Sequence, residues 1–223
     1  MLPFDRDQFI SVFVAYNNAI WPAQVAAYVL GMAIVILALR DGHRYRQAIA
    51  FGIAAMWLWT GIAYHALYFA PINRAAFFFA ALFVAQAIMV GLHGSSRGAV
   101  GLAPPKGAAG WIGIGFLAYS AVLYPLIGMW SGHRYPELPM FGVTPCPVTL
   151  FTFGMFLLAR TPLPKWLLVI PALWSLIGGS AAILLAIPQD WLLLASGIVA
   201  VPLIVLRDRS GRPGKDIERA DGV

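Results

Sequence analysis

Long apolar stretches separated by short polar segments dominate the chain. A helix that crosses the hydrocarbon core of a membrane needs about 20 mostly apolar residues. By this criterion the pattern predicts an all-α membrane protein with seven transmembrane helices. The predicted spans cover residues 21–39, 48–68, 75–92, 111–130, 144–158, 166–187 and 191–206. Trp and Tyr stand at several of the predicted ends, as is typical of side chains at membrane–water interfaces.

Residues 1–20 have the pattern of a short amphipathic helix in the membrane interface, and they lack the features of a secretory signal. Asp5 and Gln8 have the spacing of a helix-capping box, and apolar residues recur after them at helical spacing. Pro22 removes a backbone donor near the start of the first span. We therefore expect a bend between this interfacial helix and the first span.

The pattern indicates one transmembrane domain, residues 1–206, followed by a disordered basic cytoplasmic tail, residues 207–223. Residues 93–110 are rich in Gly, Ala, Ser and Pro, which predicts a flexible joint between three helices and four. Residues 131–144 form the longest predicted connection on the opposite side, stiffened by two prolines. The chain shows no convincing internal repeat, so inverted-repeat transporter architecture has no support.

Composition and charge agree with a membrane location and add an orientation. Hydrophobic residues make up 61% of the 223 residues and charged residues 11%, against about 45–50% and about 25% in soluble domains. The net charge is +6. When the loops are assigned to alternate sides of the predicted spans, three Lys and Arg residues fall on one side and twelve on the other. The positive-inside rule then places the N-terminus outside and the tail in the cytoplasm, so the expected partner is a lipid bilayer and not a nucleic acid.

Several functional classes lack their sequence features. The predicted spans contain no Asp, Glu, Lys or Arg, which argues against a carboxylate proton relay and a voltage sensor. The lysines, Lys106, Lys165 and Lys215, lie in loops or the tail, so no retinal Schiff base is expected. No metalloprotease, serine-hydrolase or P-loop motif is present, which makes an enzyme the less favoured class. The single cysteine excludes an intramolecular disulfide.

The sequence around Cys146 is the most specific local feature. Thr144 can cap a helix whose first turn holds Pro145, Cys146 and Pro147, because backbone donors are unpaired there anyway. A thiol at this place feels the positive end of the helix dipole, which favours its thiolate. The alternative is that the prolines only shape the helix start and the thiol packs as a small apolar group.

His65 is the one histidine predicted inside a span, about one turn from its outer end. Helical spacing places Trp57, Gly61 and Tyr68 on or near its face. Gly61 would permit close helix contact, and the aromatic residues would form the wall of a cavity. We interpret His65 as a ligand-binding or proton-sensing group, or alternatively as an interfacial histidine bonded to a neighbour.

These features together predict an outward-facing polar pocket. Its candidate residues are Asn17, Asn18, Tyr64, His65, Tyr68, Thr144 and Cys146. Asn18 has a simpler interpretation, in which it satisfies backbone groups that Pro22 leaves free. The outer charges, among them Arg134, Glu137 and Asp190, are expected to be solvated, with Asp190 capping the last outer turn.

No cofactor is predicted, although a soft metal ion remains a weak alternative. Cys146, His65 and His133 could together bind Cu(I) or Zn(II), but no local ligand spacing supports such a site. Haem with two histidine ligands is less favoured, because the histidines do not pair within facing spans.

Three segments resemble a known family. They are Tyr16–Gln24, Trp57–Asn73 and Gly142–Gly154, and the similarity extends over nearly the whole chain except the tail. The family consists of bacterial multi-pass membrane proteins and is catalogued only as a domain of unknown function, DUF6064. The resemblance implies a location in the bacterial inner (cytoplasmic) membrane. It implies no reaction, ligand or catalytic residue.

The sequence therefore favours a protein that handles a small ligand or ion, either permease-like or sensory, through the outward-facing pocket. A second hypothesis is a structural or assembly subunit that docks a membrane-protein partner or forms a homo-oligomer. A third, less favoured, is an enzyme that acts on a lipid or a periplasmic small molecule.

Overall fold

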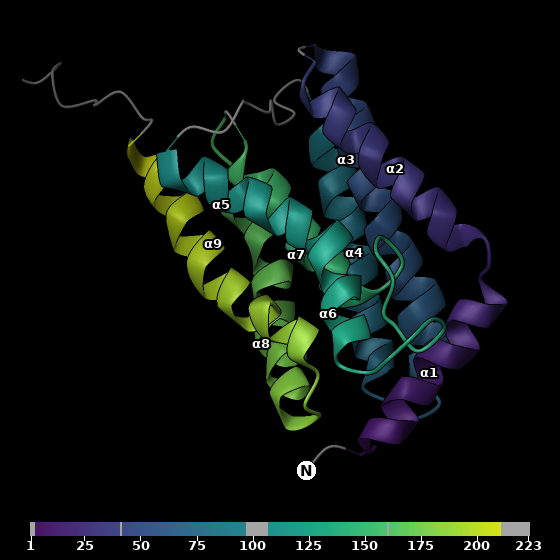
Figure 1. Ribbon diagram of the computed structural model, residues 1–223. Helices are drawn as coiled ribbons and strands as arrows, with labels where there is room; N and C mark the ends of the chain where they lie inside the picture. The colour runs from purple at the N-terminus through teal and green to yellow at the C-terminus, as the bar shows by residue number, and fades with distance from the viewer. Residues whose placement is uncertain (1–2, 41, 97–106, 160, 211–223) are drawn as a thin grey trace, which may run out of the picture.

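The computed structural model describes residues 3–40, 42–96, 107–159 and 161–210. Within these ranges the chain forms helices joined by turns and loops, with no β-strand. The prediction of an all-α protein is therefore confirmed. Figure 1 shows the helices as one bundle whose connections gather mainly at two ends.

The described residues form nine α-helices, five of which are preceded or followed by short segments of other helix types. The α-helices are α1 (Arg6–Ala19), α2 (Ala23–Ala38), α3 (His43–Trp59), α4 (Ala76–Ser95), α5 (Gly107–Ala118), α6 (Tyr124–Trp130), α7 (Pro145–Leu157), α8 (Val169–Leu184) and α9 (Trp191–Ser210). Two π-helices, η1 (Thr60–Phe69) and η2 (Tyr119–Leu123), extend α3 and join α5 to α6. Two short 3₁₀-helices, η3 (Lys165–Leu168) and η4 (Pro188–Asp190), lead into α8 and α9.

The N-terminal segment follows the predicted pattern. Asp5 and Gln8 form the expected capping box at the start of α1, and α1 and α2 meet at 86° across the predicted bend. The aromatic face of α1 packs on η1, where the rings of Phe13 and Tyr64 stack with centroids 5.6 Å apart. This face therefore contacts the protein's own bundle.

The predicted number of seven spans is wrong. Five helical segments of the described chain are long and apolar enough to cross a membrane, and six if the bent pair α1–α2 counts as one. The prediction fails at residues 144–158, because α7 has only 13 residues. The span predicted at 21–39 contains only the 16 residues of α2 and qualifies only when joined to α1. At 1.5 Å per residue α7 is about 20 Å long, whereas the hydrocarbon core measures about 30 Å.

Helix α7 is the buried centre of the bundle, which explains its apolar sequence. All its residues from Pro145 to Leu157 are buried, and Figure 1 shows it surrounded by the other helices. A hydropathy pattern cannot distinguish a helix that faces lipid from one enclosed by protein, since both are apolar on all sides.

Small residues allow the neighbouring helix α5 to approach α7 closely. A Cβ atom added to Gly154 of α7 would lie 2.9 Å from the carbonyl oxygen of Gly113 on α5. A Cβ atom added to Gly113 would in turn lie 3.0 Å from the carbonyl oxygen of Gly154. The two backbones therefore meet directly, as at small-residue contacts between membrane helices.

Polar side chains connect α7 to the rest of the bundle at its middle and at its C-terminal end. In the middle, the indole N–H of Trp57 donates to the Thr152 hydroxyl over 2.9 Å. At the C-terminal end, Arg207 of α9 donates to the carbonyl oxygens of Phe156 and Leu157 over 2.9 and 3.1 Å. These carbonyls belong to the last turn of α7, beyond the regular helical hydrogen bonds, and the Phe156 oxygen also accepts from the Ala159 N–H over 3.2 Å.

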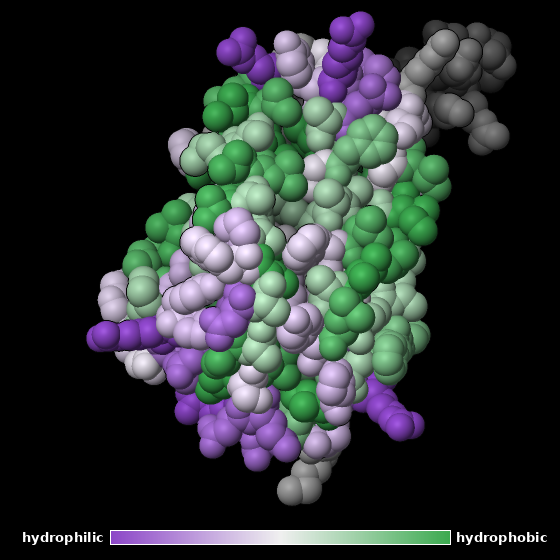
Figure 2. Space-filling model, turned by 90° about the vertical axis from the view of Figure 1, so that its right-hand side faces the viewer, coloured by the Kyte–Doolittle hydropathy of each residue, from purple (hydrophilic) through white to green (hydrophobic). Residues whose placement is uncertain are grey.

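The surface has an apolar middle and polar ends. Figure 2 shows hydrophobic side chains along the middle of one face and hydrophilic ones gathered at its two ends. Large exposed apolar residues occur on almost every long helix, for example Met32, Phe77, Trp111, Leu184 and Ile198. Such a distribution is compatible with a membrane protein.

Two of the predicted segments fall partly outside the described residues. Helix α9 continues to Ser210, so the first residues of the predicted tail at 207–223 are helical, and the rest of the tail lies outside the described chain. The predicted flexible joint at 93–110 has residues 97–106 outside the described chain, while its flanks belong to α4 and α5.

We predict that Gly154→Ala destabilises the protein. The added methyl group must push α5 away from α7, and overpacking of this kind costs about 1–3 kcal/mol. The free energy of unfolding, or the melting temperature in detergent, measures the effect. Gly115→Ala is the control, because a Cβ atom there has no heavy atom within 4 Å. An equal loss in both variants would contradict close α5–α7 contact as the cause.

Candidate functional site

A cavity of about 210 Å³ lies between α1, η1, α4, the start of α7, the end of α8, and η4. Aromatic side chains form much of its lining: Phe4, Phe9, Phe13, Tyr64, Phe69, Phe79 and Trp174. Most of the remaining lining is aliphatic or small: Pro139, Pro145, Ile177, Gly178, Ala181, Ala182, Leu184 and Leu185. The polar members are Asn73, Thr144, Cys146, Ser180 and Asp190.

Asp190 is the one charged residue among the described residues that line this cavity. Its side chain is almost fully buried, with 3% of its surface exposed. The hydroxyl group of Tyr124 donates a hydrogen bond to its carboxylate, and the Cys146 thiol lies within hydrogen-bonding reach. No basic side chain of the described residues forms an ion pair with it.

The expectation that Asp190 is a solvated capping residue is therefore wrong. Its local sequence, Pro188-Gln-Asp-Trp191, is typical of a helix start, and Asp190 does precede α9. Asp190 is buried because η4 packs against α6 and is held by the Tyr119 hydroxyl of η2, which donates to the Gln189 carbonyl oxygen over 2.9 Å. The sequence signal that could have found it is the lone acidic residue between two apolar spans.

Cys146 lies in the first turn of α7, as predicted, with Thr144 at the cap position and Pro145 at the first helical position. The Thr144 hydroxyl donates backward to the Met140 carbonyl oxygen and does not cap the helix. The thiol is 9% exposed and adjacent to Asp190. Burial and a neighbouring carboxylate both oppose formation of a thiolate, and they outweigh the favourable helix dipole.

His65 lies one layer behind the cavity, enclosed by aromatic rings. Its ring centroid is 4.7 Å from that of Phe83 and 5.0 Å from that of Trp174. Its side chain has no exposed surface, and neither ring nitrogen has a hydrogen-bond partner among the described residues. The alternative of an interfacial histidine bonded to a neighbour is therefore wrong.

The predicted shared face of this helix is correct for three of its four residues. Trp57, Gly61 and His65 all meet Phe83 of α4: the Trp57 and Phe83 centroids are 4.4 Å apart, and a Cβ atom on Gly61 would lie 3.0 Å from Phe83 Cβ. Tyr68 instead packs against α1, because η1 is a π-helix and its wider turn shifts later residues around the axis.

Asn17 has a structural role that the sequence did not reveal. Its side-chain amide donates to the carbonyl oxygens of Pro136 and Leu138, each over 2.7 Å, and Gln24 donates to its backbone carbonyl oxygen over 2.9 Å. Asn17 thereby ties the loop before α7 to the α1–α2 bend. Asn18 is exposed, so the role expected of Asn18 at this bend belongs to Asn17 and Gln24.

The structure brings together only part of the predicted outward-facing pocket. Tyr64, Thr144 and Cys146 line the cavity, and His65 contacts its aromatic wall. The other three candidates, Asn17, Asn18 and Tyr68, are not among the lining residues. The cavity is also far more apolar than expected, because α1 and α8 contribute mainly aromatic and small side chains.

The weak metal hypothesis gains no structural support. Among the described residues, no group of three His, Cys, Asp or Glu side chains could hold a metal ion. His133 lies at the surface, where its ring nitrogens are 3.2 Å from Glu137 and 3.1 Å from Arg6. His65 is enclosed by aromatic rings, and Cys146 neighbours Asp190.

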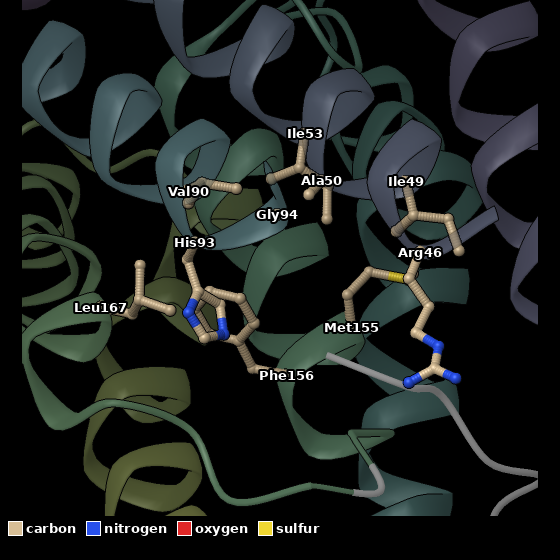
Figure 3. A pocket seen from close by; sticks show the side chains of 10 residues that line it. All are labelled: Arg46, Ile49, Ala50, Ile53, Val90, His93, Gly94, Met155, Phe156 and Leu167. Atoms are coloured by element: carbon tan, nitrogen blue, oxygen red, sulfur yellow. The ribbon is translucent and has the colours of Figure 1, made fainter. Parts of the chain in front are cut away.

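A second, smaller pocket lies at the other end of the bundle, between α3, α4, the end of α7, and η3 (Figure 3). Its volume is about 30 Å³. Figure 3 shows His93 and Arg46 on opposite sides, with Met155 and Phe156 between them. A space of this size holds little more than a water molecule, so of these two pockets the aromatic-lined cavity is the better candidate for a ligand.

The fold thus defines an all-helical protein with several apolar helices and one aromatic-lined cavity, an architecture compatible with a membrane protein. Residues 6–215 match the model of a family of unknown function, DUF6064, and the chain belongs to this family. The resemblance found in the sequence is confirmed. No curated protein and no solved structure matches the chain.

We predict that Asn17→Ala destabilises the loop before α7. The substitution removes two hydrogen bonds and leaves the Pro136 and Leu138 carbonyl oxygens without this donor, which costs about 1–3 kcal/mol. Thermal unfolding measures the loss, and maleimide labelling of Cys146 should become faster because the loop covers the start of α7. Asn18→Ala is the matched control and should change neither quantity. Equal behaviour of the two variants would refute the role of Asn17.

Proposed function

We propose that this protein is an integral membrane protein that binds a small ligand, in a permease-like or sensory role, within the cavity between α1, α7 and α8. The observation that carries this proposal is a buried carboxylate, Asp190, in the wall of an aromatic-lined cavity of about 210 Å³. Ligand sites are typically apolar concavities with a few well-placed polar groups. Burying an acidic group costs free energy unless the group is paired and hydrogen-bonded. Acidic residues within membrane-spanning segments are therefore usually functional.

Unpaired polar atoms near the cavity support the same proposal. Trp174 lines the cavity and is 7% exposed, yet its indole N–H has no oxygen or nitrogen acceptor among the described residues and lies beside the Cys146 thiol, a weak acceptor. His65 packs against Trp174 and is likewise unpaired. Buried polar groups are normally paired in native proteins, and an aromatic ring of a bound ligand would offer the Trp174 N–H a weak acceptor.

The cavity opens toward the protein surface at α8. Ser180 and Leu184 line it, and both side chains are exposed. The exposed surface of α8 is largely apolar, so in a membrane this opening would face lipid. A ligand that partitions into the bilayer, such as the neutral form of an amine, would thus reach the cavity from the membrane.

We also propose that the cavity lies at the end of the bundle away from the cytoplasm. Arg6, Arg74 and Arg134 lie beside the elements that form this end. The described basic residues near the opposite end are twice as numerous: Arg40, Arg44, Arg46, Lys165, Arg207 and Arg209. The positive-inside rule assigns the richer end to the cytoplasm.

We predict that the purified protein retains a small molecule in this cavity. Native mass spectrometry of wild-type protein in nanodiscs should detect the complex. Ala181→Trp should abolish it, because the new indole fills the space that Ala181 lines. Ile183→Trp is the control on the same helix, since Ile183 is 54% exposed and does not line the cavity. Either no bound molecule in the wild type or equal retention in all three proteins would overturn the proposed function.

We predict the orientation from a pair of single-cysteine variants made in a Cys146→Ser background. Ser131 and Ser96 are both exposed, near the cavity end and the opposite end respectively. In intact cells a membrane-impermeant maleimide should label Ser131→Cys, and Ser96→Cys should react only after permeabilisation. The reverse labelling pattern would refute the proposed orientation.

A further inference from the structure

We infer that the ligand of this cavity is a small organic cation, a protonated amine on an aromatic or aliphatic body. This inference rests on the proposed function and names the chemical class that the site recognises. It follows from the charge of the lining, from its aromatic character and from its size.

Asp190 carries the charge in the described lining of the cavity. Its carboxylate is buried, with two neutral donors nearby, the Tyr124 hydroxyl and the Cys146 thiol. Hydrogen bonds from neutral groups stabilise a carboxylate, but they leave its charge uncompensated. No Lys, Arg or His is among the described residues that line the cavity. A ligand ammonium group would supply the missing positive charge and a charge-assisted hydrogen bond.

The aromatic lining favours the same ligand. Phe13, Phe69 and Trp174 come from three different elements and line one cavity together with four further aromatic residues. Aromatic rings attract cations over their faces, and the attraction grows when the cation is removed from water. The same rings provide apolar surface for the body of the ligand.

The size of the cavity limits the ligand to one small ring or a short chain. A cavity of about 150 Å³ in another protein binds benzene. The present cavity of about 210 Å³ therefore has room for one substituted ring.

An anionic ligand is disfavoured, although α7 and α9 both begin beside the cavity. The positive ends of helix dipoles attract anions. Here Asp190 itself stands immediately before α9 and close to Cys146 in the first turn of α7. Its carboxylate occupies the place that an anion would take and would repel one.

Three aromatic probes of matched shape test this class: phenethylamine, 2-phenylethanol and phenylacetate. Binding to the full-length protein in nanodiscs is measured by isothermal titration calorimetry at neutral pH, with empty nanodiscs subtracted. We expect phenethylamine to bind about tenfold or more tightly than 2-phenylethanol, and phenylacetate to bind least. Ala181→Trp should abolish phenethylamine binding, which places the probe in the cavity.

Asp190→Asn should reduce phenethylamine affinity by about tenfold or more and change 2-phenylethanol binding little. Glu137→Gln is the control acid at the same end and should change neither, since Glu137 does not line the cavity. If Asp190→Asn fails to fold, Asp190→Glu replaces it and should keep the preference for the amine. The inference of a cationic ligand would be overturned if the amine and the alcohol bound equally and both lost binding in Ala181→Trp, or if phenylacetate bound more tightly. The proposal that the cavity binds a ligand would still stand. If none of the probes bound, the inference of a cationic ligand would be overturned. The proposed function would then be decided by the native mass spectrometry experiment alone.

Discussion

The complete burial of α7 is the constraint on which the rest of the structure depends. A helix enclosed by other helices cannot expose its unpaired backbone ends to water, so neighbouring side chains must satisfy them. Arg207 from α9 donates to the last carbonyl oxygens of α7. Before the other end, the Tyr16 hydroxyl of α1 donates to the Val143 carbonyl oxygen over 2.6 Å and so anchors the segment that leads into the helix. The first and last helices of the described chain are thus both tied to this central element.

The candidate cavity is a consequence of the same arrangement. Because α7 is short, its first turn begins inside the bundle, and the loop before it is held there by Asn17. The space beside Cys146 is bounded by the aromatic face of α1 and by the end of α8. Asp190 reaches this space because η4 turns inward before α9 begins. The helix that organises the core therefore also places the polar groups of the cavity.

Local sequence patterns predicted the elements well. The capping box at Asp5, the bend at Pro22 and the helix start at Thr144 all depend on neighbouring residues, and each occurs where expected. Five of the predicted spans correspond to helices long enough to cross a membrane. The prediction failed at 144–158, because average hydropathy reports how apolar a segment is and not what surrounds it.

The residues of the candidate site also fall into two groups: those that the sequence identified and those that only the tertiary structure placed. The sequence alone identified the aromatic helix around His65 and the helix start at Cys146, because both are marked by residues close together in the chain. Only the tertiary structure decided that Asp190, 44 positions after Cys146, lies beside it, and that Asn17 holds a loop while Asn18 is exposed. These outcomes depend on how segments far apart in the sequence pack together. A local sequence pattern does not predict the free energy of such contacts.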